Sequence, residues 1–374
     1  MPLLAVAKNL KLSSLRNLKI TVISERRSRF SHILEPKPDF VDEVVRINSG
    51  KLRRYHDDSW LKRVFDFKTN FLNLRDIILL LAGIIEAAVL IIRTRPDVIF
   101  IKGGYVGVPV GICAWILRVP YITHDSDTCP GLTNRIIGPG ARHNAVGMKQ
   151  GHYGYPKSKT VYVGISISDE YHKLNTGIGR QKANFGQPRG HKMILILGGS
   201  SGAQKLDEIV KDALKIILKE DSKIFVIHQV SAGNIGQYND WPEQIRNKIR
   251  TETFLKPLAP YVLAADLVVS RAGATIIAEL ASLHKPVIVV PHPGLSAGHQ
   301  LANARMLKNS NAAVVIQQNS ETASQQLASN IKDLLASETK SVQLGKHLSD
   351  LFDTSATQKI GDLILKTAEY AEKK

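Results

Sequence analysis

The sequence has little of several features that would point to particular classes of protein. It contains two cysteines in 374 residues, Cys113 and Cys129, which stand in unlike contexts and form no C-x-x-C pair. Two isolated cysteines exclude a disulfide framework, and zinc-finger spacing is missing. We therefore expect a protein of a reducing cytoplasm.

Long apolar runs are also scarce. The longest, residues 77–92, contains Glu86, and it is shorter than the ~20 apolar residues that cross a bilayer. The first residues, MPLLAVAKNLKL, have too short an apolar core and no small-residue cleavage site for a secretory signal. We expect neither a transmembrane helix nor a secretory signal.

Acidic side chains are outnumbered by basic ones. Lys and Arg total 50 against 33 Asp and Glu, which gives a formal charge of +17. This excess favours an anionic partner: nucleic acid, an acidic membrane surface or a phosphorylated substrate. The bases are spread along the chain without a basic tail or an aromatic-basic ribonucleoprotein motif, so we expect no nucleic acid.

Apolar residues, at 44% of the chain, are sufficient for two hydrophobic cores. The length exceeds that of a usual single domain, so two domains are expected. Strand patterns alternate with helix patterns through most of the chain, which indicates α/β domains with parallel sheets.

Residues 265–304 show the organisation most completely. They read as a strand (267–270), a turn of small residues, a helix (275–283) and a second strand (287–290). In such units the ligand lies at the carboxyl ends of the strands. Glu279 is placed to accept hydrogen bonds from ribose hydroxyls, and Gln300 can both donate and accept. Taken alone, each would more often be a solvated side chain.

A glycine-rich loop opens the second domain. The strand 193–197 runs into Gly198-Gly199-Ser200-Ser201-Gly202 and then a helix. Free N–H groups at a helix start, together with the Ser200 hydroxyl, make a site for a diphosphate. The alternative is a tight turn that binds nothing.

The first domain has two comparable loops. Gly103 and Gly104 follow the strand 97–101, and His124, Asp125 and Asp127 follow the strand 121–123. H-D-x-D is compatible with a divalent metal, but no second cluster completes the coordination, so we expect no metal.

An aromatic, basic segment precedes these loops. Trp60, Val64, Phe67, Phe71 and Leu74 recur at helical spacing in residues 59–74. The bases around them are Lys51, Arg53, Arg54, Lys62, Arg63, Lys68 and Arg75. Either this helix packs on its own domain, or it forms a patch that faces an anionic membrane surface.

Four motifs occur in order: G-G-Y, G-L-T-N-R, G-G-S-x-G-A, and R-A-G-A followed by H-Q-x-x-N-A. Together they resemble the MurG family, the N-acetylglucosaminyltransferases of peptidoglycan synthesis. The resemblance implies an α/β fold with two Rossmann-like domains of GT-B type. We place these domains at residues 1–162 and 163–352, with a final helix, 353–374, returning to the first.

The resemblance also implies the reaction. A family member is an inverting hexosyltransferase that moves N-acetylglucosamine from UDP-N-acetylglucosamine to a lipid-linked muramoyl-pentapeptide, forming lipid II without a cofactor. It works as a peripheral protein at the cytoplasmic face of the cell membrane. The alternatives are a GT-B transferase with another lipid acceptor, a nucleotide-sugar epimerase, or a binding-only protein.

Site residues follow by matching positions to the family motifs. Asp125 or His124 would be the catalytic base. The donor would contact Asp127, Ser200, Leu255, Ala274, Thr275, Glu279 and Gln300. The acceptor would contact Gly103, Gly104, Tyr105 and Asn134. The chain departs from the family where H-E-Q-N reads H-D-S-D, and where the arginine of G-N-P-V-R is absent from residues 164–168.

The first helix pattern, residues 3–10, has no strand before it. Family members have a first strand and a G-G-T-G-G-H loop at that point. A doubly wound sheet would place that strand between the strands 18–24 and 97–101. We therefore expect a first domain that lacks one strand and is poorly folded unless a segment further upstream supplies it.

Overall fold

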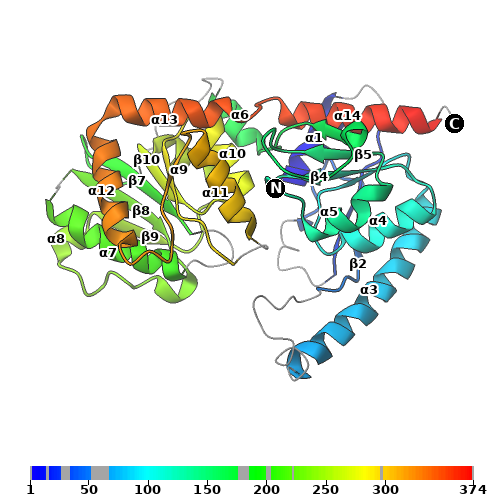
Figure 1. Ribbon diagram of the computed structural model, residues 1–374, viewed down its shortest axis with the longest axis horizontal. Helices are drawn as coiled ribbons and strands as arrows, with labels where there is room; N and C mark the ends of the chain where they lie inside the picture. Colours follow the sequence, from blue (N-terminus) through cyan, green and yellow to red (C-terminus); the bar gives the residue numbers. More distant parts are fainter. Residues whose placement is uncertain are drawn as a thin grey trace. The chain divides into compact units, whose positions relative to one another are not determined.

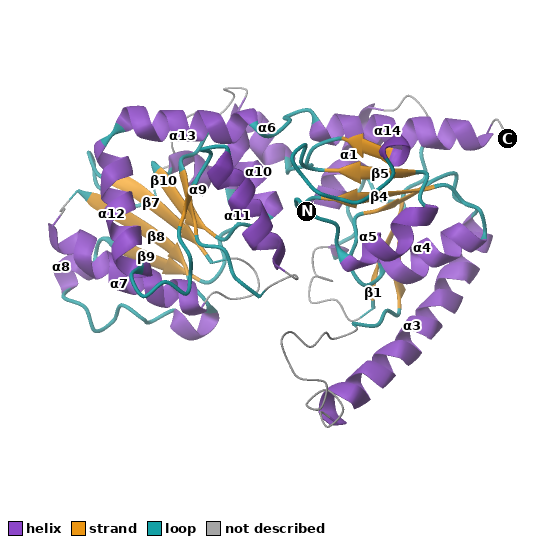
Figure 2. Ribbon diagram, viewed as in Figure 1, coloured by secondary structure: helices purple, strands orange, loops and turns teal. Residues whose placement is uncertain are grey.

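The computed structural model describes residues 2–13, 17–26, 34–51, 67–175, 185–198, 204–220, 223–294 and 298–372. The chain forms two compact units (Figure 1). Unit 1 comprises Met1–Ser166 and Ser355–Lys374, and unit 2 comprises Ile167–Thr354. Both contain parallel strands and helices, as expected for an α/β protein (Figure 2).

Unit 2 has one parallel sheet of six strands in the order β12-β11-β10-β7-β8-β9. The strands are β7 (Lys192–Leu197), β8 (Ile224–Gln229), β9 (Ile249–Glu252), β10 (Leu267–Ser270), β11 (Val287–Val289) and β12 (Val314–Val315). Ser270 is in register with Leu197 of β7 and with Val289 of β11. The loops after these three strands therefore leave the same edge of the sheet.

Eight helices accompany this sheet in the described part of unit 2. They are α6 (Asp169–Asn175), α7 (Gln204–Glu220), α8 (Glu243–Arg246), α9 (Ala259–Ala264), α10 (Ala274–Ser282), α11 (His299–Asn309), α12 (Ala323–Ala336) and α13 (Glu338–Asp350). Both faces of β7 are buried, since Ile194 and Leu195 point to opposite faces and neither is exposed. Such double burial explains the continuous apolar strand sequences.

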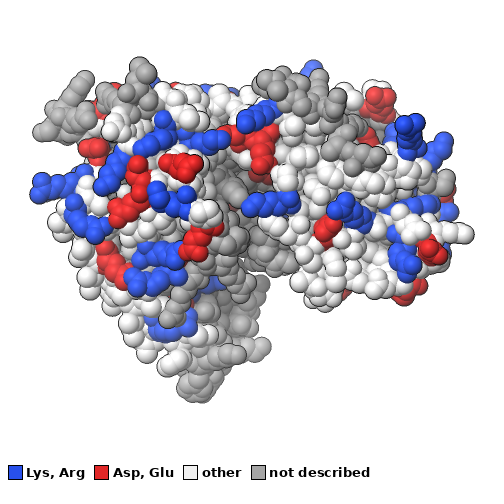
Figure 3. Space-filling model, turned by 180° about the vertical axis from the view of Figure 1, so that it is seen from behind, with Lys and Arg blue, Asp and Glu red and all other residues white. Residues whose placement is uncertain are grey.

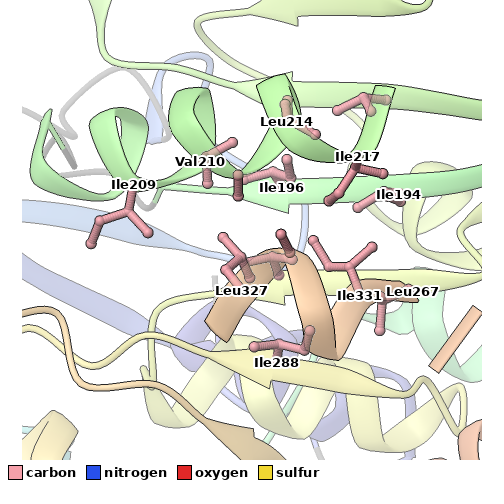
Figure 4. Close-up of a cluster of buried hydrophobic side chains, with 14 of the residues drawn as sticks. Ile194, Ile196, Ile209, Val210, Leu214, Ile217, Leu267, Ile288, Leu327 and Ile331 are labelled. Carbon is pink, nitrogen blue, oxygen red and sulfur yellow. The ribbon is translucent and has the colours of Figure 1, made fainter. Parts of the chain in front are cut away.

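A cluster of aliphatic side chains fills one face of this sheet (Figure 4). Leu214 and Ile217 of α7 and Leu327 and Ile331 of α12 pack there with Ile196 of β7. Each fully buried Leu or Ile stabilises the fold by roughly 1.5–3 kcal/mol. This core holds the strand ends in place, and the site loops extend from those ends.

Unit 1 has two separate parallel sheets, one of order β1-β2 and one of order β3-β4-β5-β6. The strands are β1 (Thr21–Glu25), β2 (Glu43–Ile47), β3 (Ile99–Ile101), β4 (Tyr121–Asp125), β5 (His143–Val146) and β6 (Thr160–Tyr162). Its described helices are α1 (Pro2–Ser13), α3 (Phe67–Thr94), α4 (Gly107–Ile116), α5 (Leu132–Ile137) and α14 (Ala356–Glu372).

The break between the two sheets falls between β1 and β3. Ile23 and Ile99 pack against one hydrophobic cluster, whereas Ile20 and Phe100 pack against another. Both strands therefore lie in one layer between the same two cores, yet no ladder joins them in the described residues.

The last helix, α14, belongs to unit 1. Ile360 and Ile364 of α14 pack with Val6 and Leu10 of α1, and the Thr357 hydroxyl lies 2.9 Å from the Ser166 hydroxyl. The chain thus returns to unit 1 after passing through unit 2.

The region before β3 is dominated by one long helix. This helix, α3, runs from Phe67 to Thr94, so it contains the end of the segment 59–74 predicted to be helical and the whole apolar run 77–92. The rest of the predicted aromatic segment, with Arg53, Arg54, Lys62 and Arg63, lies outside the described residues. The helix ends just before Arg95-Pro96, where proline disfavours helical backbone in the preceding residue.

Candidate active site

Two loops of unit 1 meet at the carboxyl ends of adjacent strands. Ile101 of β3 is in register with Thr123 of β4, so residues 102–105 and 124–127 follow side by side. Gly103 and Gly104 have φ angles of 93° and 81°, a backbone conformation that favours glycine. A Cβ atom at Gly104 would have no neighbour within 4 Å. The loop therefore leaves open space next to its main chain.

His124 is buried, with both ring nitrogens engaged. Nε2 lies 2.9 Å from the Gly164 carbonyl oxygen, so it carries the proton and donates it. Nδ1 faces Lys102 Nζ at 3.4 Å. Burial, followed by the nearby Lys102 charge, lowers the pKa of His124 to about 3. This neutral ring has no free nitrogen for a substrate proton, so its contacts suit positioning better than base catalysis.

Asp125 lies at the centre of a hydrogen-bond network. Its Oδ1 accepts from Gly131 N and from Asn134 Nδ2, both at 2.9 Å, and its Oδ2 accepts from the Tyr155 hydroxyl at 2.7 Å. Burial raises the pKa of this carboxyl against the lowering effect of these bonds. A raised pKa makes this carboxylate a stronger base, and one lone pair of Oδ2 stays available.

Asn134 connects this network to the glycine loop. Its Nδ2 also donates to the His124 carbonyl at 2.9 Å, while its Oδ1 is buried without a hydrogen-bond partner. A Cβ atom on Gly103 would lie 3.8 Å from the Asn134 amide. A buried acceptor without a partner, next to open backbone, is suited to a ligand donor.

Lys102 is a site residue that the motifs did not single out. Its Nζ donates to Ser126 Oγ at 2.8 Å and is attracted by the charges of Asp125 and Asp127. Burial lowers the pKa of Lys102 to about 8 despite these two acids. The available signal was a lysine at a strand end directly before a glycine pair, opposite an acidic loop.

In unit 2 the turn between β10 and α10 is fixed by long-range hydrogen bonds. Asn303 Nδ2 donates to the Ala272 carbonyl at 3.0 Å, and Arg271 Nη1 donates to the Val290 carbonyl at 2.9 Å. These bonds place Ala274 and Thr275 in the first turn of α10, at the carboxyl edge of the sheet. Ala274 is buried and Thr275 is half-buried.

Glu279 lies one turn further along α10. Burial raises its pKa to about 7. The nearby Tyr171 hydroxyl interacts with this carboxyl but is buried without a hydrogen bond of normal geometry. The pair can therefore take up hydroxyl groups of a ligand, with the carboxylate as acceptor and the phenol as donor.

The remaining predicted donor contacts occupy different positions. Gln300, at the start of α11, accepts from His292 N at 2.8 Å through Oε1 and keeps its amide N–H groups. Leu255 is buried, which leaves only its main chain for a ligand. Asp127 lies in the unit 1 loop, where its carbonyl accepts from Tyr153 at 2.9 Å. Ser200 lies outside the described residues, between the end of β7 and the start of α7.

A metal centre has no support in the described ranges. There, no three His, Cys, Asp or Glu side chains are grouped so that they could hold an ion. His124 and Asp125, the last two residues of β4, bond to protein groups.

Known proteins are similar to this chain in sequence and in fold. Residues 1–145 match the glycosyltransferase family 28 N-terminal domain, and residues 193–360 match its C-terminal domain. A Bacillus cereus protein is 37% identical over 274 residues, 72% of this chain and 71% of its own length. It is named UDP-N-acetylglucosamine--N-acetylmuramyl-(pentapeptide) pyrophosphoryl-undecaprenol N-acetylglucosamine transferase 2. A transferase of the same name, without the number, from Clostridium perfringens is 35% identical over 292 residues, 77% of this chain and 75% of its own.

Solved structures extend the similarity to the whole fold. The crystal structure of Acinetobacter baumannii MurG has a TM-score of 0.71 at 22% identity and covers 98% of this chain and 95% of its own. A UDP-GlcNAc 2-epimerase from Neisseria meningitidis has a TM-score of 0.64 at 13% identity, with 98% and 96% covered. At these identities the likeness concerns the fold, which is of GT-B type. With the family models and the transferase relatives, it establishes that this chain belongs to the MurG family of glycosyltransferase family 28.

Proposed function

We propose that this chain transfers N-acetylglucosamine from UDP-N-acetylglucosamine to a lipid-linked muramoyl-pentapeptide, producing lipid II for peptidoglycan synthesis. The observation that carries the proposal is the identity of 37% to a transferase of that name over most of both chains. The donor-side and acceptor-side motifs of the family occur in unit 2 and unit 1, respectively.

On the donor side, each group has a distinct task. Glu279 and Tyr171 bind the ribose hydroxyls, and the amide of Gln300 holds the diphosphate or sugar. The main chain at Leu255 reads uracil, and the loop with Ser200 stabilises the diphosphate as it leaves. Helix-terminus N–H groups suit that last task because negative charge develops there in the transition state.

On the acceptor side, Asp125 is the proposed base. As the acceptor hydroxyl attacks the anomeric carbon from the face opposite UDP, its proton passes to Asp125 Oδ2, and UDP takes the electrons of the broken bond. Lys102 and His124 position the loop, while Gly103, Gly104, Tyr105 and Asn134 bind the acceptor. No step calls for a metal or a cofactor.

A nucleotide-sugar epimerase is the second candidate, because an epimerase has the same fold at a TM-score of 0.64. Its identity of 13% is far below the 37% of the transferase, so transfer is favoured. Product analysis by mass spectrometry separates the two. We expect UDP-N-acetylglucosamine to stay unchanged alone and to be consumed when the lipid-linked acceptor is added, whereas an epimer formed from the donor alone would contradict transfer.

We also propose that α3 attaches the protein to the cytoplasmic face of the membrane. Seven apolar residues at helical spacing on α3 each expose more than half of their surface: Phe71, Leu74, Ile78, Leu81, Ile85, Val89 and Ile92. Trp115 and Ile116 of the neighbouring α4 are exposed as well. Such an apolar area on a folded domain is typical of an interaction with a membrane or a protein.

The length of α3 bears on the expectation that the chain has no transmembrane helix. Asn70–Thr94 is long and apolar enough to cross a membrane by length and composition, and about a fifth of its most apolar window, 22%, is buried. However, Glu86 on the inner side accepts from Asn48 N at 2.6 Å and from Asn48 Nδ2 at 2.8 Å. The inner side also packs against α4, which supports a helix lying in the membrane interface.

Basic side chains accompany the exposed face of α3. On the face shown in Figure 3, Lys and Arg are interspersed with Asp and Glu. Of the bases predicted to surround the aromatic segment, Lys51 and Arg75 are exposed in the structure. In the proposed attachment, the exposed apolar side chains of α3 insert into the interface and anionic lipids attract the bases.

A further inference from the structure

A polar pocket lies beside α3 in unit 1, and neither Asp125 nor its hydrogen-bond partners line it. It encloses about 140 Å³ at the carboxyl ends of β1 and β2. The charged and hydroxyl-bearing residues that line it are Glu25, Arg26, Ser49, Lys51, Arg75 and Asp76. None of them takes part in the proposed transfer chemistry.

The Ser49 hydroxyl is the first sign that this pocket binds a ligand. Ser49 lines the pocket and is only 5% exposed, yet its Oγ has no hydrogen-bond partner. Buried hydroxyls in folded proteins are normally hydrogen-bonded. A polar ligand would supply the partner that Ser49 lacks.

Two arginines of the pocket are held in place by acids. Arg75 Nη2 and Nε lie 2.8 Å and 3.2 Å from Asp76 Oδ1, and Asp76 is buried. Arg26 Nη2 lies 3.1 Å from Glu86 Oε1. These bonds orient each guanidinium and leave its other N–H donors for a ligand.

The two remaining charged side chains of the pocket, Lys51 and Glu25, have opposite signs. Lys51 and Glu25 make no ion pair with any residue that the structure describes, whereas Arg26 and Arg75 are balanced by Glu86 and Asp76. The pocket thus offers a cation, an anion and directed N–H groups at no net charge. That combination favours a ligand with both a carboxylate and an ammonium group over a doubly charged phosphate.

The pocket adjoins the loop expected to bind the acceptor. Lys51 Nζ lies 5.6 Å from the centre of the Tyr105 ring, and Tyr105 follows Gly103 and Gly104. We infer that the pocket is a subsite for the zwitterionic peptide of the acceptor. Lys51 and Arg75 bind a carboxylate and Ser49 donates to it, while Glu25 binds an ammonium group. The inference rests on the proposed function, because it presumes an acceptor that carries a peptide.

Kinetics with two acceptors test the subsite. Ser49→Ala and Lys51→Met should each raise the KM for the lipid-linked acceptor about 10-fold, as expected for lost hydrogen bonds to charged groups, without changing the KM for the donor. An acceptor with an acetylated, amidated peptide should show the raised KM already with the wild-type protein. Lys157→Met removes the same charge from an exposed position of unit 1 and should leave both KM values unchanged.

A direct measurement of peptide binding tests the subsite without requiring the transfer reaction. Saturation-transfer NMR should detect a soluble zwitterionic pentapeptide on the wild-type protein, and Lys51→Met and Glu25→Gln should abolish the signal. Equal signals in all three proteins, or displacement of the peptide by inorganic phosphate at similar concentration, would overturn the inference. If no acceptor is glycosylated, the proposed transfer fails, but peptide binding still decides the role of the pocket.

Discussion

Two buried polar oxygens stand out among the candidate site residues. The Tyr171 hydroxyl in unit 2 lies beside Glu279 without a hydrogen bond of normal geometry, and Asn134 Oδ1 in unit 1 lies near Gly103 without a hydrogen-bond partner. Sequence motifs predicted Glu279, Gly103 and Asn134 as site residues, because they occupy recognisable positions after strands. The motifs did not include Lys102, although its place at a strand end before the glycine pair was a signal, and they could not point to Tyr171, which meets Glu279 only through tertiary packing.

Donor affinity should depend on the Glu279 carboxylate. Glu279→Ala removes the acceptor of the ribose hydroxyls, and charged hydrogen bonds contribute about 1.5–3 kcal/mol. We expect the Kd for UDP-N-acetylglucosamine to rise at least 10-fold in calorimetry. Glu321→Ala, an exposed substitution in the same unit, is the control, and unchanged affinity in Glu279→Ala would remove this residue from the donor site.

The pH dependence of donor binding follows from the same group. The pKa of Glu279 is raised from 4.5 to about 7, so the folded protein keeps a proton that the unfolded chain releases. Its contribution to stability is therefore present below pH 4.5 and falls as the pH rises toward 7. Donor binding needs the ionised carboxylate of Glu279, so donor affinity increases as the pH rises. We expect affinity to rise about 10-fold between pH 6 and 8.

Glu279→Gln provides the control for this pH dependence. The amide does not titrate, so the slope of affinity between pH 6 and 8 should disappear, although the affinity itself is lower. A slope of equal size in wild type and Glu279→Gln would assign the titration to another group, for example to the donor phosphates.

The loop that contains Ser200 is proposed to bind the diphosphate of the donor, and a substitution of Ser200 tests this. Ser200→Ala should raise the KM for the donor severalfold, because a hydroxyl bond to a charged phosphate is lost. Ser310→Ala, outside the loop in the same unit, serves as the matched change. Equal donor KM values in wild type and Ser200→Ala would mean that this loop is only a turn.

At the scale of elements, the strands and helices of unit 2 were the easiest to predict. β10 spans residues 267–270, as its β-branched pattern indicated, because buried parallel strands read as short apolar runs. α3 was harder. Its sequence is apolar on two sides, and only the packing on α4 and the bonds of Glu86 show which side faces the protein.

The exposed stripe of α3 should control membrane attachment. Replacing Ile78 and Ile85 by Ser removes two exposed apolar groups, so partition onto anionic vesicles should fall about 10-fold or more. Sedimentation with vesicles at low salt measures the effect. Val342→Ser, an exposed apolar position in unit 2, is the matched control, and wild-type protein that stays in the supernatant would defeat the proposal.

The break between β1 and β3 should lower the stability of unit 1. Unpaired interior backbone groups cost about 1–3 kcal/mol each, and several of them rival the net stability of a domain, about 5–15 kcal/mol. A protein carrying an additional apolar strand and glycine-rich loop before α1 should unfold at a higher temperature and release UDP faster. Equal unfolding temperatures and rates in both proteins would show that the layer needs no further strand.

For the whole molecule, the order of motifs was sufficient to predict two α/β units and the family. Each motif follows a strand end, and parallel strands bring such ends to one edge of a sheet. The sequence could not reveal the network that joins Asp125 to Asn134 and Tyr155, or the Ser49 pocket. Those contacts join residues that are up to 60 positions apart and depend on side-chain geometry.

The central claim is that this chain joins N-acetylglucosamine from its UDP donor to a lipid-linked muramoyl-pentapeptide, with Asp125 as the base. The most direct measurement is UDP release with the acceptor in mixed micelles, for wild type and Asp125→Asn, with the product linkage assigned by NMR. We predict release that requires the acceptor, an inverted linkage, and a kcat about 100-fold or more lower in Asp125→Asn. Release without acceptor, a retained linkage, or equal kcat in the two proteins would contradict the account.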